Sequence, residues 1–209
     1  MKFLQKAKKS LGQNFLIDKN IINKIIEIGN INKNKSVMEI GAGYGNLTKA
    51  IVCMEPKKIL AVEKDKKLAF FLKKKFKNYK NLKIINRDIF NIIEEKNLEQ
   101  NMVVFGNLPY NVSTRILASL IMLKDWPPWY DVLILMFQKE VADRILAKKQ
   151  TKEFSRLTVL SNWRLEIKKH FNVSKNCFFP KPKINSTLLS FKPKINNRFN
   201  LKNPKNLEK

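Results

Sequence analysis

Ser36-Val37-Met38-Glu39-Ile40-Gly41-Ala42-Gly43-Tyr44-Gly45-Asn46-Leu47-Thr48 is the stretch of the chain that decides the fold. Its apolar first half predicts a short strand, and its glycines predict a tight turn that leads into a helix. A strand, a glycine-rich turn and a helix in this order are typical of the first unit of a doubly wound α/β sheet that binds a nucleotide. We therefore predict a mostly parallel central sheet with helices on both faces.

The spacing of the glycines argues against two common nucleotide sites. Gly41, Gly43 and Gly45 follow the pattern G-x-G-x-G, whereas dinucleotide-binding folds use G-x-G-x-x-G and phosphate-binding loops end in G-K-[ST]. Glu39 lies directly before the turn, where its carboxylate would repel a pyrophosphate and attract a cationic ligand. Because glycines let the backbone approach a ligand closely, we predict that Glu39, Gly41 and Gly43 contact a cationic, nucleotide-like cofactor.

The next three predicted strands also end in polar side chains. These are residues 59–62 before Glu63, residues 82–86 before Asp88, and residues 102–106 before Asn107. Because the carboxyl ends of parallel strands meet at one edge of a sheet, we expect these side chains to lie close together. Glu63 follows Gly41 by 63 − 41 = 22 residues, close to the ~20 at which an acidic residue meets ribose hydroxyls. Asp88 suits the exocyclic amine of an adenine.

Asn107-Leu108-Pro109-Tyr110 places further chemistry at the tip of the fourth strand. Asn107 and a main-chain carbonyl near Leu108 are placed to accept hydrogen bonds from one exocyclic amino group. Pro109 has a fixed φ and no N–H, which holds the turn still. The ring of Tyr110 is suited to lie flat against a purine. The alternative is an ordinary Asn/Pro turn after a strand.

The remaining chain continues the alternation of strands and helices. We expect helices at 19–29, 65–77, 113–123, 138–148 and 155–162, and further strands at 132–137, 163–170 and 184–191. The expected inner face of the helix over 65–77 consists of Leu68, Phe71, Leu72 and Phe76, with lysines outside.

Composition narrows the class of partner. The 209 residues include 42 Lys+Arg against 17 Asp+Glu, a net charge of +25, which points to nucleic acid first and an anionic membrane surface second. Cys53, Cys177 and His170 are too few for a disulfide framework, a His-based metal site or a Ser-His-Asp triad. The chain also has neither a secretory signal nor the ~20 apolar residues of a membrane helix. We expect a cytoplasmic protein with no metal.

Four motifs, in their order, resemble those of S-adenosylmethionine-dependent methyltransferases that act on the N6 amine of adenine: Glu39 to Gly45, Glu63, Asp88, and Asn107 to Tyr110. Two further stretches, Lys9 to Leu16 and Phe178 to Ser186, closely resemble the opening and closing motifs of the KsgA family of rRNA adenine N6,N6-dimethyltransferases, relatives of the Erm macrolide-resistance methylases. The resemblance covers residues 8–191 and implies a Rossmann-like class I methyltransferase fold.

The resemblance implies roles for the cofactor-binding residues. Asn14 and Leu16 would close over the methionine end of S-adenosylmethionine, Glu63 would hold its ribose, and Asp88 would hold its adenine amine. Asn107 would lie between the cofactor and the target base.

The resemblance also implies how RNA is bound. Tyr110 and Phe178 would sandwich a flipped-out adenosine, with Phe178 chosen over Phe179 because the family pattern is Phe-x-Pro-x-Pro-Lys. The substrate would be two neighbouring adenosines near the 3′ end of small-subunit (16S) rRNA in the 30S subunit, and we expect a monomer. The side chains expected to contact RNA are Lys8, Lys9, Lys149, Lys152, Lys181 and Lys183.

Three parts are expected along the chain: a basic arm over 1–17, the methyltransferase domain over 18–191, and a linker over 192–209. Family members usually continue into a small helical domain, so we expect either a truncated chain or a naturally short protein. Two alternative functions stay open, a large-subunit methylase of the macrolide-resistance type and a mainly non-catalytic ribosome-assembly factor. An NAD-dependent oxidoreductase has no use for Asn-Leu-Pro-Tyr, and Cys177 lacks the Pro-Cys context of a cytosine-5 methyltransferase.

Overall fold

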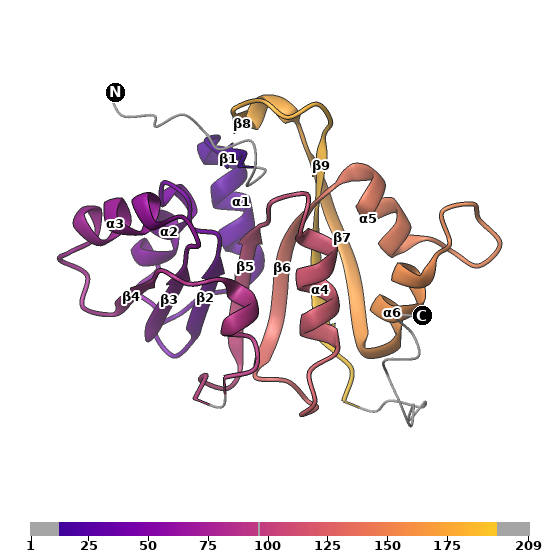
Figure 1. The fold of residues 1–209 in the computed structure, drawn as a ribbon, viewed down its shortest axis with the longest axis horizontal. Coiled ribbons are helices and arrows are strands. Elements are labelled where there is room, and N and C mark those ends of the chain that lie inside the picture. The colour runs from indigo at the N-terminus through magenta and orange to yellow at the C-terminus, as the bar shows by residue number, and fades with distance from the viewer. Residues whose placement is uncertain (1–12, 96, 196–209) are drawn as a thin grey trace.

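The computed structural model describes residues 13–95 and 97–195. Its strands are β1 (Phe15–Leu16), β2 (Ser36–Ile40), β3 (Lys58–Val62), β4 (Leu82–Ile85), β5 (Met102–Asn107), β6 (Tyr130–Gln138), β7 (Leu165–Val173), β8 (Phe178–Phe179) and β9 (Ser186–Pro193). Its helices are α1 (Lys19–Gly29), α2 (Asn46–Cys53), α3 (Lys66–Lys75), α4 (Ser113–Ile121), α5 (Lys139–Leu146) and α6 (Arg156–Arg164), with short 3-10 turns η2 (Ile89–Asn91) and η3 (Lys175–Cys177). Figure 1 shows their arrangement.

Seven strands form one sheet in the order β4-β3-β2-β5-β6-β9-β7. The five strands from β4 to β6 are parallel, whereas β9 runs antiparallel to both β6 and β7. The predicted mostly parallel sheet is confirmed. Successive strands run outward from β2 to β4 on one side and from β5 on the other, so the carboxyl ends of β2 and β5 flank the point where the strand order reverses. Open α/β sheets bind their ligands there.

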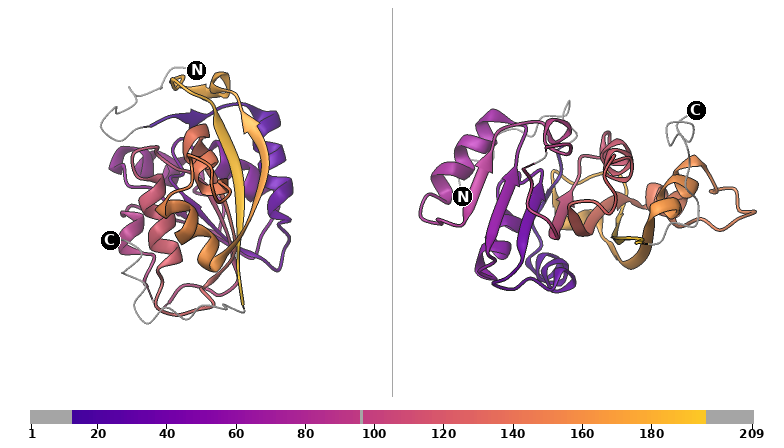
Figure 2. Two further views of the ribbon diagram at one scale, coloured as in Figure 1. Left: turned by 90° about the vertical axis from the view of Figure 1, so that its right-hand side faces the viewer. Right: turned by 90° about the horizontal axis from the view of Figure 1, so that it is seen from below.

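Helices cover both faces of the sheet, as the sequence predicts (Figure 2). Along β3, Ile59 belongs to the cluster beneath α1 and α2, and Ala61 contacts the cluster that includes Leu72 of α3. The alternate residues, Leu60 and Val62, belong to the cluster beneath α4 and α5. This alternation is the period-two pattern of a strand buried on both faces. Among the described residues, no helix is long and apolar enough to cross a membrane.

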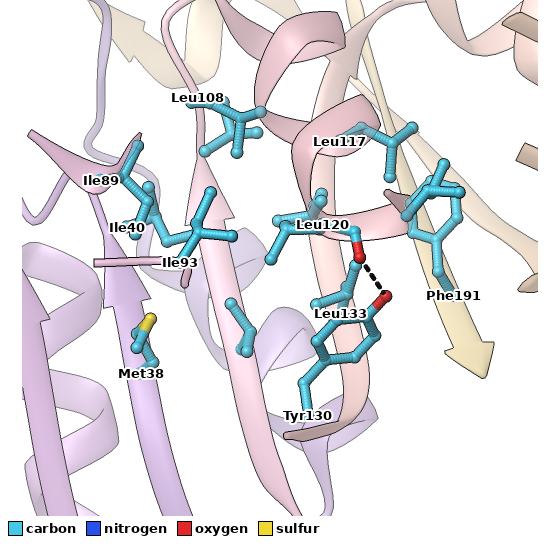
Figure 3. Close-up of a cluster of buried hydrophobic side chains, with 14 of the residues drawn as sticks. Met38, Ile40, Ile89, Ile93, Leu108, Leu117, Leu120, Tyr130, Leu133 and Phe191 are labelled. Atoms are coloured by element: carbon cyan, nitrogen blue, oxygen red, sulfur yellow. Dashed lines mark hydrogen bonds between the residues drawn. The ribbon is translucent and has the colours of Figure 1, made fainter. Parts of the chain in front are cut away.

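The larger core cluster fixes the turn that follows β5 (Figure 3). Within it the Tyr130 hydroxyl donates a hydrogen bond of 3.1 Å to the main-chain carbonyl of Leu120 on α4. The side chain of Leu108 points into the same cluster and is almost fully buried. Because Leu108 anchors the turn from below, Asn107 and Pro109 on either side of it are held at the edge of the sheet.

The structure differs from the sequence-based expectations at several element boundaries, in one strand pairing and on one helix face. β7 and β9 begin and end two or three residues later than the expected strands at 163–170 and 184–191. β6 begins at Tyr130, two residues before the expected strand, and β1 and β8 form a two-stranded antiparallel ladder that the sequence did not predict. On α3, Leu68, Ala69 and Leu72 are buried, whereas Phe71 is 40% exposed. The expectation that Phe71 faces the core is therefore wrong, because the buried stripe of this helix is narrower than its apolar residues suggest.

Candidate active site

A cavity of about 210 Å³ opens at the carboxyl edge of the sheet. Its wall combines the glycine-rich turn after β2, the residues after β3 and β4, the turn after β5, and the segment before β1. The predicted site residues that line it are Asn14, Gly41, Gly43, Glu63, Asp88, Asn107, Leu108, Pro109 and Tyr110. Five stretches that are far apart in the sequence are thus brought to one place. Leu16, Glu39 and Phe178 do not line the cavity.

Glu63 and the glycine-rich turn form one hydrogen-bonded unit. The Gly43 N–H donates to Glu63 Oε2 and the Asp65 N–H donates to Oε1, both at 2.8 Å. Burial raises the pKa of the Glu63 carboxyl, while the N–H groups of Asp65 and Gly43 act in the opposite direction. The two main-chain donors orient the carboxylate at the wall of the cavity, where a diol would meet both oxygens.

Positive φ angles let this turn pass close to its neighbours. Gly41 and Gly43 have φ of +75° and +58°, which residues with side chains rarely adopt. A Cβ atom on Gly43 would lie 2.8 Å from Cδ1 of Phe15, so a side chain there would displace the ring that β1 contributes to the cavity. The main chain of the turn is therefore the surface that a ligand would meet.

Asp88 is placed by the end of β4 and the start of η2. Its Oδ2 accepts a hydrogen bond of 2.8 Å from the Lys64 ammonium, and its Oδ1 accepts from the Phe90 N–H at 3.2 Å. Partial burial acts to raise the pKa of Asp88, but the hydrogen bonds from Lys64 and Phe90 outweigh it and lower that pKa. Lys64, Arg87 and Phe90 also line the cavity and were not predicted, since nothing in their spacing marks them.

Asn107 is oriented by the segment before β1. Its Nδ2 donates a hydrogen bond of 2.9 Å to the main-chain carbonyl of Asn14. This leaves Oδ1 as the acceptor atom of a side chain that lines the cavity. The turn continues with a hydrogen bond of 3.1 Å from the Val112 N–H to the Pro109 carbonyl.

Tyr110 is held by a distant strand. Its hydroxyl and the Ser186 hydroxyl at the start of β9 are 2.7 Å apart. Burial raises the pKa of the Tyr110 phenol, and the hydrogen bond with Ser186 only partly opposes this rise. The phenol is therefore neutral at physiological pH, and its ring is an oriented apolar surface at the cavity wall.

The structure does not support the prediction that Glu39 contacts the cofactor, because the Glu39 carboxyl lies in the core beside α2. It is 2% exposed and accepts a hydrogen bond of 2.5 Å from the Thr48 hydroxyl. Burial raises the pKa of Glu39 to about 8, although the Thr48 hydrogen bond acts to lower it. The next residue, Ile40, faces the cavity instead. Side chains alternate along a strand, so Glu39 supports the turn from beneath and does not line the cavity.

The β1–β8 ladder corrects two further predictions. Leu16 pairs with Phe178 and Phe15 pairs with Phe179, and paired residues lie on the same face of an antiparallel ladder. Leu16 and Phe178 belong to the core beneath α1, where Phe178 is 3% exposed. On the other face, Phe15 lines the cavity and Phe179 is 45% exposed. Of the two ladder pairs, it is therefore Phe15 and not Leu16 that lines the cavity, and Phe179 and not Phe178 that is exposed.

The predicted RNA-binding lysines that the structure describes are absent from the cavity wall. Lys149 and Lys152 are exposed between α5 and α6, and Lys181 and Lys183 are exposed between β8 and β9. Lys8 and Lys9, and most of the predicted arm over 1–17 and linker over 192–209, lie outside the described residues.

In the part of the chain that the structure describes, no group of three His, Cys, Asp or Glu residues is placed to hold a metal ion.

The sequence model of the ribosomal RNA adenine dimethylase family matches residues 4–208. The chain belongs to this family. A relative from Pelagibacter ubique, named ribosomal RNA small subunit methyltransferase A, is 52% identical over 98% of this chain and 76% of its own length. The relative of the same name from Nitrobacter winogradskyi is 39% identical over 91% of this chain and 67% of its own.

Solved structures agree with the family assignment. A dimethyladenosine transferase from Plasmodium falciparum superimposes with a TM-score of 0.75 at 31% identity, covering 86% of this chain and 63% of that one. The 23S rRNA methyltransferase ErmE has a TM-score of 0.73 at 24% identity, covering 90% of this chain and 72% of that one, and shares the fold. This ribosomal RNA adenine dimethylase is thus an S-adenosylmethionine-dependent methyltransferase of class I fold.

Proposed function

We propose that this ribosomal RNA adenine dimethylase methylates the N6 amines of two neighbouring adenosines near the 3′ end of small-subunit (16S) rRNA. The product is N6,N6-dimethyladenosine, formed in the cytoplasm by a monomer acting on the 30S subunit during ribosome biogenesis. The names of the curated relatives support the small-subunit target. The observation that carries the proposal is the amide of Asn107, which Asn14 orients within the cavity.

The glycine-rich side of the cavity suits S-adenosylmethionine. The main chain at Gly41 and Gly43 offers a close approach, Glu63 offers acceptors for the two ribose hydroxyls, and Asp88 offers an acceptor for the adenine amine. These acidic groups also favour a cation. The cofactor supplies an electrophilic methyl group on its sulfonium.

The Asn107 side of the cavity suits the target amine. An adenine N6 lone pair is delocalised into the ring, which makes the amine a poor nucleophile. Acceptors at Asn107 Oδ1 and at the main-chain carbonyl near Leu108 would hold the two N–H bonds and localise the lone pair. The amine would form its new N–C bond as the methyl–sulfur bond of the cofactor breaks, with the electron pair left on sulfur as a neutral thioether. It would then release one proton to water, so no strong base is needed. Most of the acceleration comes from positioning and electrostatic stabilisation.

Two aromatic rings are proposed to hold the flipped-out base. Tyr110 would stack on it in the orientation that Ser186 sets. Phe179 is proposed as the second ring in place of Phe178, because Phe178 is buried and Phe179 is exposed. Phe179 also lies on the same face of the β1–β8 ladder as Phe15, which lines the cavity.

The test is methyl transfer from labelled S-adenosylmethionine to undermethylated small ribosomal subunits, followed by nucleoside analysis of the rRNA. We expect N6,N6-dimethyladenosine near the 3′ end, and a rate that falls steeply with salt because lysines bind RNA phosphates. Methylation of large-subunit rRNA alone would overturn the substrate assignment. Cofactor binding without transfer would favour the assembly-factor alternative.

A further inference from the structure

The outer surface of α3 and the loop after it has an unusual charge. Residues 64–83 contain nine lysines and one acidic residue, Asp65. The Asp65 side chain is buried, and its Oδ1 accepts hydrogen bonds from the N–H groups of Lys67 and Leu68 at the start of α3. The surface itself is therefore positive throughout. Eight of the nine lysines are exposed and make no ion pair within the described part of the chain: Lys66, Lys67, Lys73, Lys74, Lys75, Lys77, Lys80 and Lys83.

Two phenylalanine rings stand among these lysines. Phe70 is 60% exposed and Phe71 is 40% exposed. The Lys74 ammonium lies 4.6 Å from the centroid of the Phe70 ring, and the Lys75 ammonium lies 5.7 Å from that of Phe71. Neighbouring exposed rings on a wholly positive helix combine the two features that bind single-stranded nucleic acid, a stacking surface and phosphate-binding cations.

One of the two exposed rings, Phe71, is connected to the wall of the cavity. Tyr44 of the glycine-rich turn contacts Phe71 on one side, with ring centroids 5.9 Å apart, and Phe15 on the other, with centroids 4.6 Å apart. The Lys75 ammonium donates a hydrogen bond of 2.7 Å to the Tyr44 carbonyl. Because Phe15 lines the cavity, an aromatic path runs from the cavity to the outer face of α3.

We propose that the α3 aromatic surface, defined as Phe70, Phe71, Lys66, Lys67, Lys73 and Lys74, binds unpaired nucleotides of the substrate RNA beside the target adenosine. Bases stack on the two rings while the lysines neutralise phosphates. Unpaired nucleotides fit better than a duplex, because a ring can stack only on a base whose face is free. This inference rests on the proposed function, since it takes the substrate to be RNA.

The experiment measures binding of the full chain to a labelled single-stranded oligoriboadenylate of about 12 nucleotides, with a 12-base-pair RNA duplex in parallel. The double variant F70L/F71L removes both rings and keeps apolar bulk, and F70Y/F71Y keeps both rings. We expect F70L/F71L to weaken single-strand binding by at least about fivefold, because each stacked base contributes substantially to such complexes. F70Y/F71Y should bind like the wild type, and duplex binding should change by less than about twofold in both variants.

A charge variant tests the second element of the surface. K73Q/K74Q should make the negative slope of log affinity against log salt shallower by about 1.4, since each phosphate contact to a single strand contributes roughly 0.7. The matched control is K168Q/K169Q on β7, because β7 is the sheet edge opposite β4 and both lysines are exposed. It makes the same change in net charge and should alter the slope by less than half as much.

Each contrary outcome has a distinct meaning. The proposal is overturned if F70L/F71L binds the single strand as the wild type does, if F70Y/F71Y loses as much as F70L/F71L, or if either variant loses affinity for S-adenosylmethionine. It is also overturned if the surface binds phosphatidylserine vesicles and no RNA. A wild type that binds the oligonucleotide but transfers no methyl group to small subunits overturns the proposed function and leaves this inference standing.

Discussion

The two sides of the cavity are built in different ways. On the cofactor side, Glu63 is held by main-chain donors 20 and 2 residues away, at Gly43 and Asp65. On the base side, Asn107 is held by a carbonyl 93 residues away at Asn14, and Tyr110 by a hydroxyl 76 residues away at Ser186. The cofactor side is a local structure of one βαβ unit, whereas the base side exists only when the ends of the domain are folded against its centre.

This difference means that the two sides respond differently to substitution. If the proposed roles hold, changes on the cofactor side alter binding of a small molecule by a preformed turn. Changes on the base side then alter either the contact with the target amine or the long-range contacts that place it. The following predictions separate these effects.

The largest effect is expected on the stability of the protein, from Phe178, because its ring is buried in the core beneath α1. Phe178→Ala should reduce the free energy of unfolding by about 3–5 kcal/mol, as removal of a buried ring usually does. Phe179→Ala, as the matched control, should change it by less than about 0.5 kcal/mol. Urea denaturation of both variants measures this. Equal losses of stability would show that the two faces of the β1–β8 ladder are wrongly assigned.

The next effect is expected at the amine-binding group. Asn107→Ala should lower the rate of methyl transfer by at least about 100-fold, comparable to loss of one positioned polar group at a reacting centre. Its affinity for S-adenosylmethionine should change little. Single-turnover transfer and calorimetric binding separate the two quantities. Wild-type rates in this variant would remove Asn107 from the mechanism.

On the cofactor side, Glu63→Gln should weaken S-adenosylmethionine binding by about tenfold, because an amide oxygen and an NH₂ group replace two ribose acceptors. Once the cofactor is saturating, the transfer rate should recover to within a few-fold of the wild type. Calorimetry with the cofactor alone is the measurement. A dissociation constant identical to that of the wild type would show that the carboxylate only orders the turn.

A pH-dependent effect is expected at the buried carboxyl beneath the turn. Burial raises the pKa of Glu39 from 4.5 to about 8, so between these values the folded protein holds a proton that the unfolded chain releases. The stability that this contributes is present at low pH and is lost as the pH rises from about 4.5 to about 8. Glu39→Gln should remove a slope of about 1.4 kcal/mol per pH unit. Urea denaturation at several pH values checks this, and an unchanged slope would contradict it.

Local sequence was sufficient for most of the fold. The parallel strands, the glycine turn and its acidic partner Glu63 follow from residue patterns within one βαβ unit, and their places at strand tips follow from the rules of doubly wound sheets. The errors fall at Glu39, Leu16, Phe178 and Phe71, where the question was which face of an element a residue occupies. The spacing of a motif does not determine which face of the element a side chain occupies, because a shift of one residue along a strand moves the side chain to the opposite face.

The sequence by itself therefore determined the family, the order of the strands' polar tips and the chemistry available at each tip. The tertiary structure decided which groups meet. The pairing of β1 with β8 buries Phe178 and exposes Phe179, and the long-range hydrogen bonds to Asn14 and Ser186 orient Asn107 and Tyr110. The physical reason is that local backbone preferences act over a few residues. The groups that hold Asn107 and Tyr110 in place come from segments that only the folded core brings together.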